Sequence, residues 1–324
     1  MRTLICLLAA AISYAGSAVA QGVVAFPAQP IRLMVGYSAG GTADVVARAL
    51  AQEMGRSLGQ PVVVENKAGA NALIATNELM RAAPDGYTLL MASLSHVVNP
   101  ILNAQRATYD PVHDFSPVAR VGVLPLVLAT SYNSPYSTVA ELLESARANP
   151  GAVSYGSAGV GGSGHLAGAM LEQDSGTTML HAPFKGNAPA LLEVMAGRIS
   201  FMFYPTIGIA QQIDDKKIRV LGAASDERLT QFPDVPTLQE AGYPGFDSTA
   251  IWLGILAPKN TPSPVVSRLA QAVSQSLANP ELKARIEGMG LQPIDDTSQA
   301  FSKFLHDDHD RWARVIRKAG LLPQ

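Results

Sequence analysis

The chain has 324 residues, with 24 Lys and Arg against 26 Asp and Glu, and a formal net charge of −2. At about 150 residues per domain, this length favours two domains that can each bury a core. Because 48% of the residues are hydrophobic and only 15% are charged, a disordered chain is excluded. The charge balance argues against a general nucleic-acid binder, which needs clustered Lys and Arg. One cysteine excludes an internal disulfide and a multi-cysteine metal site.

The N-terminus has the layout of a secretory signal peptide. A basic start at Met1-Arg2 precedes an apolar run over residues 4–12, and Ala18-Val19-Ala20 is an A-x-A cleavage site. The apolar run is shorter than the roughly 20 residues of a transmembrane helix. Cys6 lies inside this run rather than at the cleavage point, so no lipid anchor is expected. We therefore expect cleavage after Ala20 and an exported, periplasmic protein.

Short apolar runs alternate with segments of helical periodicity after residue 30. Strands are predicted at 31–36, 61–65 and 87–92, with helices at 43–58 and 71–82 between them. Beyond Pro135 the pattern predicts helices at 138–148, 166–173 and 188–196, and strands at 153–156, 178–182, 199–203 and 218–224. After Pro258 helices are predicted at 264–278, 280–289 and 297–319. This alternation predicts parallel sheets covered by helices on both faces, an α/β fold.

Two long apolar stretches are predicted to be strands that cross between two lobes. They are residues 118–129, in which Arg120 is the single charge, and residues 249–257, which hold none. Two crossings mean that the chain leaves the first lobe, builds the second and returns. We expect lobe 1 to contain residues 21–124 and 253–324, and lobe 2 to contain residues 125–252. Ligands in such sheets bind at the carboxyl ends of the strands, which places a ligand cleft between the lobes.

Two glycine-rich loops match catalytic or cofactor motifs. Gly36-Tyr37-Ser38-Ala39-Gly40 fits G-x-S-x-G, the nucleophile elbow of α/β-hydrolases. Several strands precede the elbow in that fold, whereas one does here, so a secreted serine hydrolase using Ser38 is kept only as an alternative. Residues 159–164 fit G-x-G-x-x-G, but the next predicted strand ends without the acid that would bind a ribose. No cofactor and no metal are therefore expected.

The two loops share a simpler property. Gly40-Gly41-Thr42 and residues 159–164 each place backbone N–H groups at the predicted start of a helix. The helix dipole favours an anion there, and glycine lets the anion approach the backbone closely. One such loop in each lobe would hold a carboxylate without any arginine, and Asp44 is expected to cap the first helix. The alternative interpretation is that both loops are only tight turns.

Short motifs in a fixed order give the chain a resemblance to a known family. They are PIRL (30–33), AGGTADVVAR (39–48), GQPVVVENK (59–67), APDGYTLL (83–90), NP (99–100), YGSAG (155–159), S-x-HLA (163–167), FKG-x-APA (184–190), PDVPT (233–237) and LAP (256–258). Together they resemble the extracytoplasmic substrate-binding proteins of tripartite tricarboxylate transporters, the Bug family. The resemblance covers essentially all of the chain after residue 20.

The resemblance implies a fold, a function and partners. The fold is that of a two-lobed periplasmic binding protein (type II), and the function is that of a non-enzymatic receptor for a small organic carboxylate. The receptor would be a monomer that delivers its ligand to the membrane permease subunits of a tripartite tricarboxylate transporter. A receptor that only senses the ligand, and signals to a membrane kinase, is the second alternative.

The resemblance also implies where the ligand lies, between the loops around residues 37–44 and 157–165. The expected ligand-binding residues are Tyr37, Ser38, Gly40, Gly41, Thr42, Asp44, Ser93, His96, Ser157, Ala158, Gly159, Ser163, His165, Lys185 and Tyr204. Local roles compete with this assignment. Ser93, Ser95 and His96 could be loop groups with local partners, His165 a cap or packing residue, and Lys185 a solvated side chain at the rim.

Two further features of the sequence bear on the ligand and on the C-terminal helix. Tyr204-Pro205 stands where the family commonly has an aspartate followed by a polar residue. If that aspartate binds an ammonium or a hydroxyl in relatives, this chain lacks the contact. The run His306-Asp307-Asp308-His309 could share a metal by its spacing, but its charged surroundings favour a solvated helix face. Trp252 is expected to pack within the crossing strand.

Overall fold

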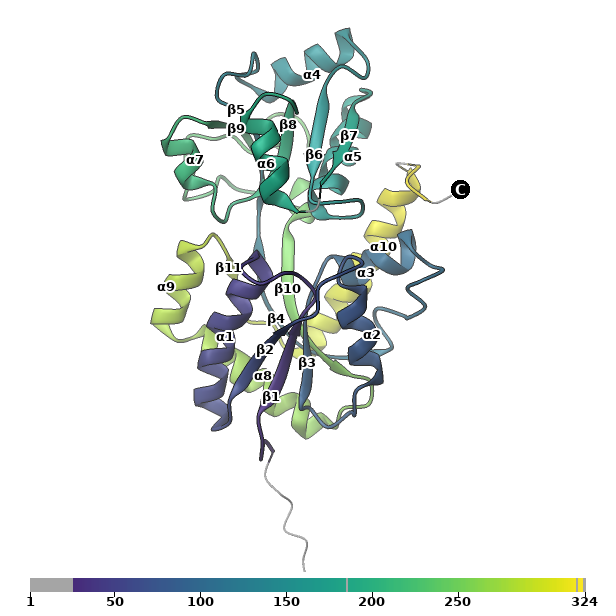
Figure 1. Ribbon diagram of the computed structural model, residues 1–324, viewed down its shortest axis with the longest axis vertical. Helices are drawn as coiled ribbons and strands as arrows, with labels where there is room; N and C mark the ends of the chain where they lie inside the picture. Colours follow the sequence, from purple (N-terminus) through teal and green to yellow (C-terminus); the bar gives the residue numbers. More distant parts are fainter. Residues whose placement is uncertain (1–25, 185, 319, 323–324) are drawn as a thin grey trace, which may run out of the picture.

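The computed structural model describes residues 26–184, 186–318 and 320–322 (Figure 1). Two sheets lie end to end, each covered by helices, and extended segments connect them (Figure 1). The expected signal peptide lies outside the described residues. Within the described part of the chain, no helix is both long and apolar enough to cross a membrane.

The first sheet, as far as the chain is described, has six strands in the order β11-β4-β10-β3-β1-β2. β1 (Ile31–Val35) runs parallel to its neighbours β2 (Val62–Asn66) and β3 (Thr88–Ser93). β10 (Ile251–Pro258) is antiparallel to β3 and to β4 (Phe115–Leu124), and β11 (Gln292–Pro293) is antiparallel to β4. β1, β2 and β3 are parallel as predicted. The sheet is mixed because β10 brings the chain back from the second lobe between two strands that run toward it.

Helices cover both faces of this sheet. α1 (Thr42–Leu58), α8 (Ser263–Leu277) and α9 (Pro280–Gly288) pack on one face. α2 (Leu73–Arg81), α3 (Ser95–Leu102) and α10 (Ser298–Lys318) pack on the other. In α1 the buried residues Val46, Leu50 and Met54 recur at a spacing of four, which is the helical periodicity that predicted this element. The sequence did not predict α3.

The second sheet has five strands among the described residues, in the order β7-β6-β8-β5-β9. The strands are β5 (Leu126–Ser131), β6 (Ser154–Ser157), β7 (Leu180–Pro183), β8 (Phe201–Pro205) and β9 (Ile218–Ala224). β6 is parallel to β7 and β8, whereas β5 is antiparallel to β8 and β9. This sheet is therefore mixed as well, because β5 runs away from the first lobe and β8 and β9 run back toward it.

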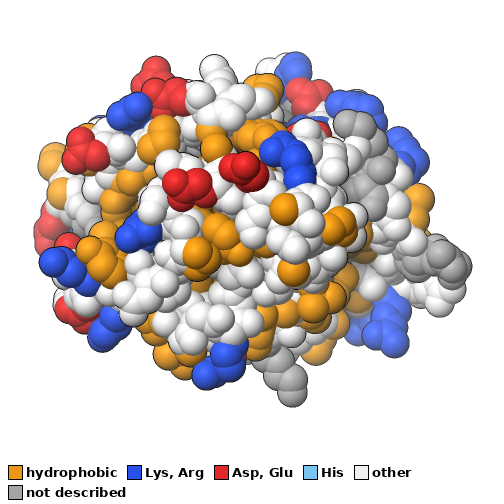
Figure 2. Space-filling model, turned by 90° about the horizontal axis from the view of Figure 1, so that it is seen from above, with side chains coloured by type: hydrophobic (Ala, Val, Ile, Leu, Met, Phe, Trp, Pro, Cys, Tyr) orange, Lys and Arg blue, Asp and Glu red, His pale blue; other side chains and the backbone are white. Residues whose placement is uncertain are grey.

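The helices of the second lobe also lie on both faces of their sheet. α4 (Val139–Ala148), α5 (Ser163–Ser175) and the 3₁₀ helix η1 (Phe246–Thr249) pack on one face. α6 (Asn187–Met195) and α7 (Ala210–Asp214) flank the other. Seen from the end of this lobe, acidic and basic side chains are interspersed over the surface (Figure 2).

The connections between the lobes differ in detail from the two continuous strands predicted. The stretch 118–129 is two strands, since β4 ends at Leu124 and β5 begins at Leu126 in the other sheet. Pro125 separates them because proline has no N–H to donate to a ladder. The second connection is made by η1 and Ala250, and β10 lies wholly in the first sheet. The lobe boundaries at 124/125 and 252/253 stay a prediction.

Candidate ligand-binding site

The loop between β1 and α1 ends at a helix start that has no side-chain cap. Gly41 is the cap residue, with φ −74° and ψ 166°. Gly41 N–H donates to the Ser38 carbonyl at 3.2 Å, and Gly40 N–H donates to Asp44 Oδ2 at 2.8 Å. Gly40 has φ +77°, a conformation that glycine adopts without strain. Asp44 thus ties the preceding loop to the helix, while Ser38 is exposed at the tip of the turn.

The charge of Asp44 is balanced locally. The residue is 2% exposed, and its Oδ1 lies 2.9 Å from Arg48 Nη2 and accepts from Asn66 Nδ2 at 2.9 Å. Burial alone would raise the pKa of Asp44, but hydrogen bonds from Arg48, Gly40 and Asn66 outweigh it and hold the pKa below its usual range. The carboxylate is therefore ionised and already satisfied.

Hydroxyl groups at the ends of β1 and β3 form a connected cluster. Tyr37 Oη lies 3.0 Å from Ser93 Oγ and donates to Ser95 Oγ at 2.8 Å. The two serine hydroxyls lie 3.3 Å apart. Burial raises the pKa of the Tyr37 phenol, so it stays protonated and acts as a donor. These residues join the two strand ends at the edge of the sheet nearest the second lobe.

The second lobe repeats the first loop in the same register. Gly162 is the cap residue of α5, with φ −76° and ψ 159° and no side-chain cap. Gly162 N–H donates to the Gly159 carbonyl at 3.3 Å, and Gly161, with φ +80°, donates its N–H to His165 Nδ1 at 3.1 Å. Residues 38–44 and 159–165 therefore form the same turn and helix start, with Thr42 and Ser163 as the first helical residues.

The second loop is held at its beginning as well. Ser157 is fully buried, and its Oγ accepts from Gly159 N–H at 3.2 Å and lies 2.7 Å from His181 Nε2. Ala158 is exposed beside it. His181 on β7 was not among the predicted site residues. It follows Ser157 by 24 residues, and only the pairing of β6 with β7 brings the two together.

The second loop lies against the first lobe. A Cβ atom on Gly161 would lie 2.9 Å from Leu102 Cδ1 and 3.8 Å from Asn71 Nδ2. Leu166 of α5 packs in the apolar cluster between the first sheet and α10. The loop that contains Asn71 has three successive residues in the left-handed region, namely Ala70, Asn71 and Ala72 at φ 47°, 52° and 68°. Such conformations are costly without glycine, and the sequence carries no signal for them.

Two predicted residues, His96 and Tyr204, have their partners outside these loops. His96 is 2% exposed, its Nε2 donates to the Pro111 carbonyl at 2.8 Å, and its ring stacks on Tyr109. Burial is the main reason that the pKa of His96 falls to about 4. Tyr204 is half-buried in the apolar cluster between β8 and α6 of its own lobe. Lys185 lies outside the described residues.

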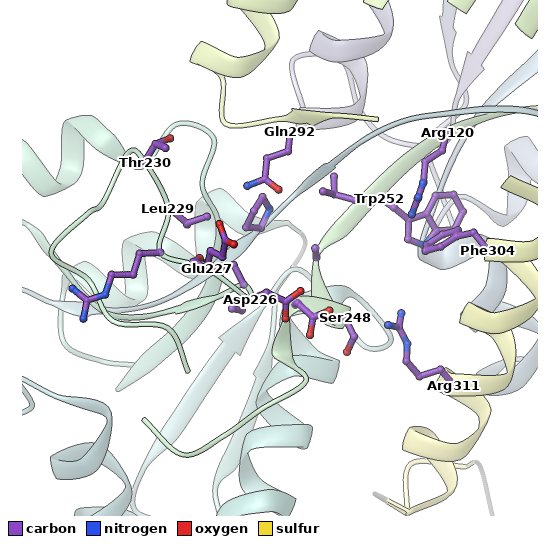
Figure 3. A pocket seen from close by; sticks show the side chains of 17 residues that line it. Arg120, Asp226, Glu227, Leu229, Thr230, Ser248, Trp252, Gln292, Phe304 and Arg311 are labelled. Atoms are coloured by element: carbon purple, nitrogen blue, oxygen red, sulfur yellow. Dashed lines mark hydrogen bonds between the residues drawn. The ribbon is translucent and has the colours of Figure 1, made fainter. Parts of the chain in front are cut away.

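A cavity of about 540 Å³ lies elsewhere between the lobes, on the side of α10 (Figure 3). Arg120, Trp252 and Arg311 line it from the first lobe, and Asp226 and Ser248 line it from the second. Both arginines are already paired, Arg120 with Asp296 at 2.7 Å and Arg311 with Asp308. None of the described residues that were predicted to bind the ligand lines this cavity. We therefore place the candidate site at the two loops.

The fold has two α/β lobes joined by two short connections, and each lobe has a helix start whose cap residue is a glycine. These features are those of a solute-binding protein of the periplasmic type. Residues 46–321 match the model of the tripartite tricarboxylate transporter family receptors. The chain belongs to this family, as its motifs led us to expect.

Similar proteins agree with this assignment. BugT of Bordetella pertussis is 32% identical over 321 residues, which is 99% of this chain and 98% of BugT. The structure of the periplasmic binding protein BugD is 34% identical with a TM-score of 0.82, covering 92% of this chain and 100% of BugD. Rpa4515 of R. palustris with adipate has a TM-score of 0.85 at 28% identity, covering 92% of this chain and 100% of Rpa4515. MatC of Rhodopseudomonas palustris with bound malate has a TM-score of 0.80 at 30% identity, covering 90% of this chain and 100% of MatC.

The family consists of non-enzymatic solute-binding receptors, so the G-x-S-x-G match at Ser38 does not mark a hydrolase. In the structure this segment is the tight turn that precedes α1. The same holds for the G-x-G-x-x-G match, whose glycines form the equivalent turn before α5.

Proposed function

We propose that this receptor captures a small organic carboxylate between the loops 37–44 and 157–165 and delivers it to a membrane permease. The observation that carries the proposal is the repeated loop, which gives each lobe a helix start capped by glycine. The first N–H groups of a helix have no partner within the helix, and the helix dipole favours an anion beside them. The adipate and malate held by Rpa4515 and MatC support a carboxylate ligand.

The groups offered to the ligand follow from this geometry. Backbone N–H groups of the first turns of α1 and α5 would bind carboxylate oxygens, and the hydroxyls of Thr42 and Ser163 stand at the first helical positions. Because Asp44 is satisfied by Arg48 and Asn66, its charge does not oppose the anion. A ligand that bridges both loops binds more tightly when the lobes are close than when they are apart. This difference in affinity between the closed and the open arrangement is what a two-lobed receptor needs.

Calorimetric titration tests this function. Malate, adipate and citrate are titrated into the purified protein, and native mass spectrometry identifies any acid that copurifies with it. Binding of at least one acid, lost when both Thr42 and Ser163 are replaced by valine, is the expected result. A protein that binds none of these acids and copurifies with none would contradict the proposal.

We propose further that residues 1–20 are removed on export, which gives a periplasmic protein with Gln21 at its N-terminus. N-terminal sequencing of the periplasmic fraction tests this, and membrane-bound protein that still carries residues 1–20 would overturn it.

Deletion of the gene separates transport from sensing. A deletion strain that no longer takes up the bound acid supports delivery to a permease, whereas normal uptake with a lost transcriptional response supports the sensor-only alternative.

A further inference from the structure

The two loops differ at one position of their shared geometry. In each loop the glycine just before the cap residue donates its N–H to the side chain four residues later. These hydrogen bonds run from Gly40 to Asp44 and from Gly161 to His165. The acceptor is a carboxylate in the first lobe and an imidazole in the second. Arg48 balances the carboxylate, whereas the residue four positions after His165 is Ala169. The second loop therefore has its acceptor without a cation in the equivalent place.

His165 accepts through a nitrogen that must carry no proton. Its Nδ1 receives the Gly161 N–H at 3.1 Å, and its side chain is buried, with 4% of the residue exposed. Its ring stacks on that of His181, with 4.0 Å between the ring centroids and 27° between the planes. A proton on Nδ1 would break the hydrogen bond, and protonation of both ring nitrogens would also place a charge against a second imidazole.

His181 holds the other end of the loop. Ser157 has one hydroxyl proton, which it donates to the Gly159 carbonyl at 3.1 Å, so its oxygen is left as an acceptor. His181 Nε2, 2.7 Å away, is therefore the donor of that contact. The ring of Tyr155 stacks on His181 from β6 at a centroid distance of 4.9 Å. The stacked rings of His165 and His181 thus hold Ser157 and Gly161, the residues at the two ends of the turn.

The surroundings keep the pair uncharged. The titratable groups that face His165 are His181 from β7 and Tyr155 from β6, whereas α3 faces the loop with Leu102 and Val98. Burial, and for His165 also the neighbouring ring, lowers the pKa of both histidines to about 4. An aspartate at position 165 would put an unbalanced negative charge beside the loop.

We propose that His165 and His181 are positioning residues for the ligand: the stacked, uncharged pair holds the second loop so that its N–H groups meet the ligand carboxylate without an adjacent negative charge. This inference rests on the proposed function, because that function places the ligand at this loop. Asp44 performs the same positioning in the first loop, where Arg48 removes the cost of its charge.

Four variants separate geometry from charge. His165→Asn keeps an acceptor near the position of Nδ1, and His165→Asp adds a charge that the first loop shows to be compatible with the turn. His181→Phe keeps the ring stack and loses the bond to Ser157, and His181→Gln restores a donor at about the position of Nε2. His113→Asn is the matched control, since His113 is an exposed histidine of the first lobe that pairs with Asp110.

Two readouts are used, amide hydrogen exchange without ligand and calorimetric titration with malate and adipate. We expect His181→Phe to speed exchange in residues 157–161 by about tenfold, with residues 38–44 unchanged, and His181→Gln to restore protection. We expect His165→Asp to leave exchange near that of the wild type while weakening binding by at least about tenfold, and His165→Asn to stay within about threefold.

Each outcome supports or overturns the inference. Wild-type exchange in His181→Phe overturns the role of His181, and wild-type affinity in His165→Asp overturns the role of the uncharged acceptor. If the wild-type protein binds no carboxylate, the proposed function fails, while the exchange measurement still decides whether the two histidines hold the loop. Equally faster exchange in residues 38–44 of His181→Phe would overturn the local role, because it would show a general loss of structure.

Discussion

The absence of a side chain at Gly41 leaves the first N–H groups of α1 accessible to a ligand. Its φ of −74° suits any residue, and a Cβ atom would lie 3.2 Å from the Ser38 carbonyl, so valine is tolerated by the backbone with a small adjustment. The same side chain would stand over the first N–H groups of α1. We expect Gly41→Val to weaken binding of malate or adipate by roughly two decades, about a third of a micromolar binding energy of about −8.2 kcal/mol.

Calorimetry measures this loss, with circular dichroism as the check on folding. Gly288→Val, at the end of α9, is the matched control, since a Cβ atom there meets nothing within 4 Å. An unchanged dissociation constant for Gly41→Val would show that the loop is only a turn.

Buried histidines make stability depend on pH. Burial is the first cause that lowers the pKa of His96, His165 and His181 to about 4, whereas the unfolded value is about 6.5. Below about pH 6.5 the unfolded chain therefore binds about one more proton per histidine than the folded chain does, and the free energy of unfolding falls until about pH 4. Stability should be constant in this respect above pH 7.

Urea denaturation at pH 7.0 and at pH 4.8 measures the effect. We expect His165→Asn to lose less stability between these two values than the wild type does, by about one proton's contribution, or about 1.4 kcal/mol per pH unit. Equal losses in both proteins would contradict the assignment of a lowered pKa to His165.

Residue types in the sequence predicted the loops but not all of their partners. The glycines at 40, 159 and 161 indicated tight turns because positive φ favours glycine, and the structure has them at φ 77°, 135° and 80°. His181 was missed because its contact with Ser157 depends on strand pairing. The left-handed conformations of residues 70–72 could not be predicted in this way, because none of the three is a glycine.

At the scale of the element, apolar patterns predicted the positions of strands along the chain better than their neighbours in the sheet. Apolar runs located the strands, but nothing in their spacing places β10, which was predicted as the strand that returns from the second lobe, between β3 and β4. α3 was missed for another reason. The helix has only eight residues and Pro100 lies inside it, so its sequence lacks the length and the uninterrupted pattern that predict a helix. Its polar side chains are buried by tertiary hydrogen bonds, such as that from His96 to Pro111.

The C-terminal helix corrects one expectation and yields a prediction. The segment 306–309 was predicted to be a solvated face, yet Asp308 is 2% exposed, and its Oδ2 accepts from Trp252 Nε1 at 2.9 Å. Arg311 pairs with the same carboxylate. We expect Asp308→Leu to destabilise the protein by about 1–3 kcal/mol, because the buried Trp252 N–H loses its acceptor.

Asp308→Asn keeps an acceptor for Trp252 and should cost clearly less. Denaturant unfolding of both variants provides the measurement, and Asp307→Leu on the exposed face of the same helix is the control. Equal losses in the Leu and Asn variants would show that packing, rather than the hydrogen bond, sets the stability here.

At the scale of the whole molecule, the loops and the cavity lie in different regions between the lobes. Pro125 and Ala250, from the two connections, line the cavity together with Trp252. The repeated loops instead stand at the carboxyl ends of β1 and β6. A movement of the lobes about the connections therefore changes the spacing at both places. If a ligand binds at the loops as proposed, the same two segments would link that binding to the shape of the cavity.

The composition of the candidate site predicts which acids bind. Among its described residues Asp44 is the only carboxylate, and Arg48, Asn66 and Gly40 already occupy its oxygens. Tyr204 packs with apolar side chains of its own lobe and offers no carboxylate. An α-ammonium group on the ligand would lose water without gaining a carboxylate partner, which is costly. We therefore expect aspartate, which has an ammonium in place of the malate hydroxyl, to bind far more weakly than malate.

A thermal-shift comparison of these two acids measures the difference on one carbon skeleton. A ligand at 100 times its dissociation constant adds about 2.7 kcal/mol to the free energy of unfolding, enough to raise Tm by several degrees. Malate should produce this shift in the wild type and lose it in Gly41→Val, which ties the shift to the loop. Stabilisation by aspartate without stabilisation by malate would mean that a carboxylate does reach the ammonium. In that case Asp44 must exchange Arg48 for the ligand, and Asp44→Asn would abolish aspartate binding.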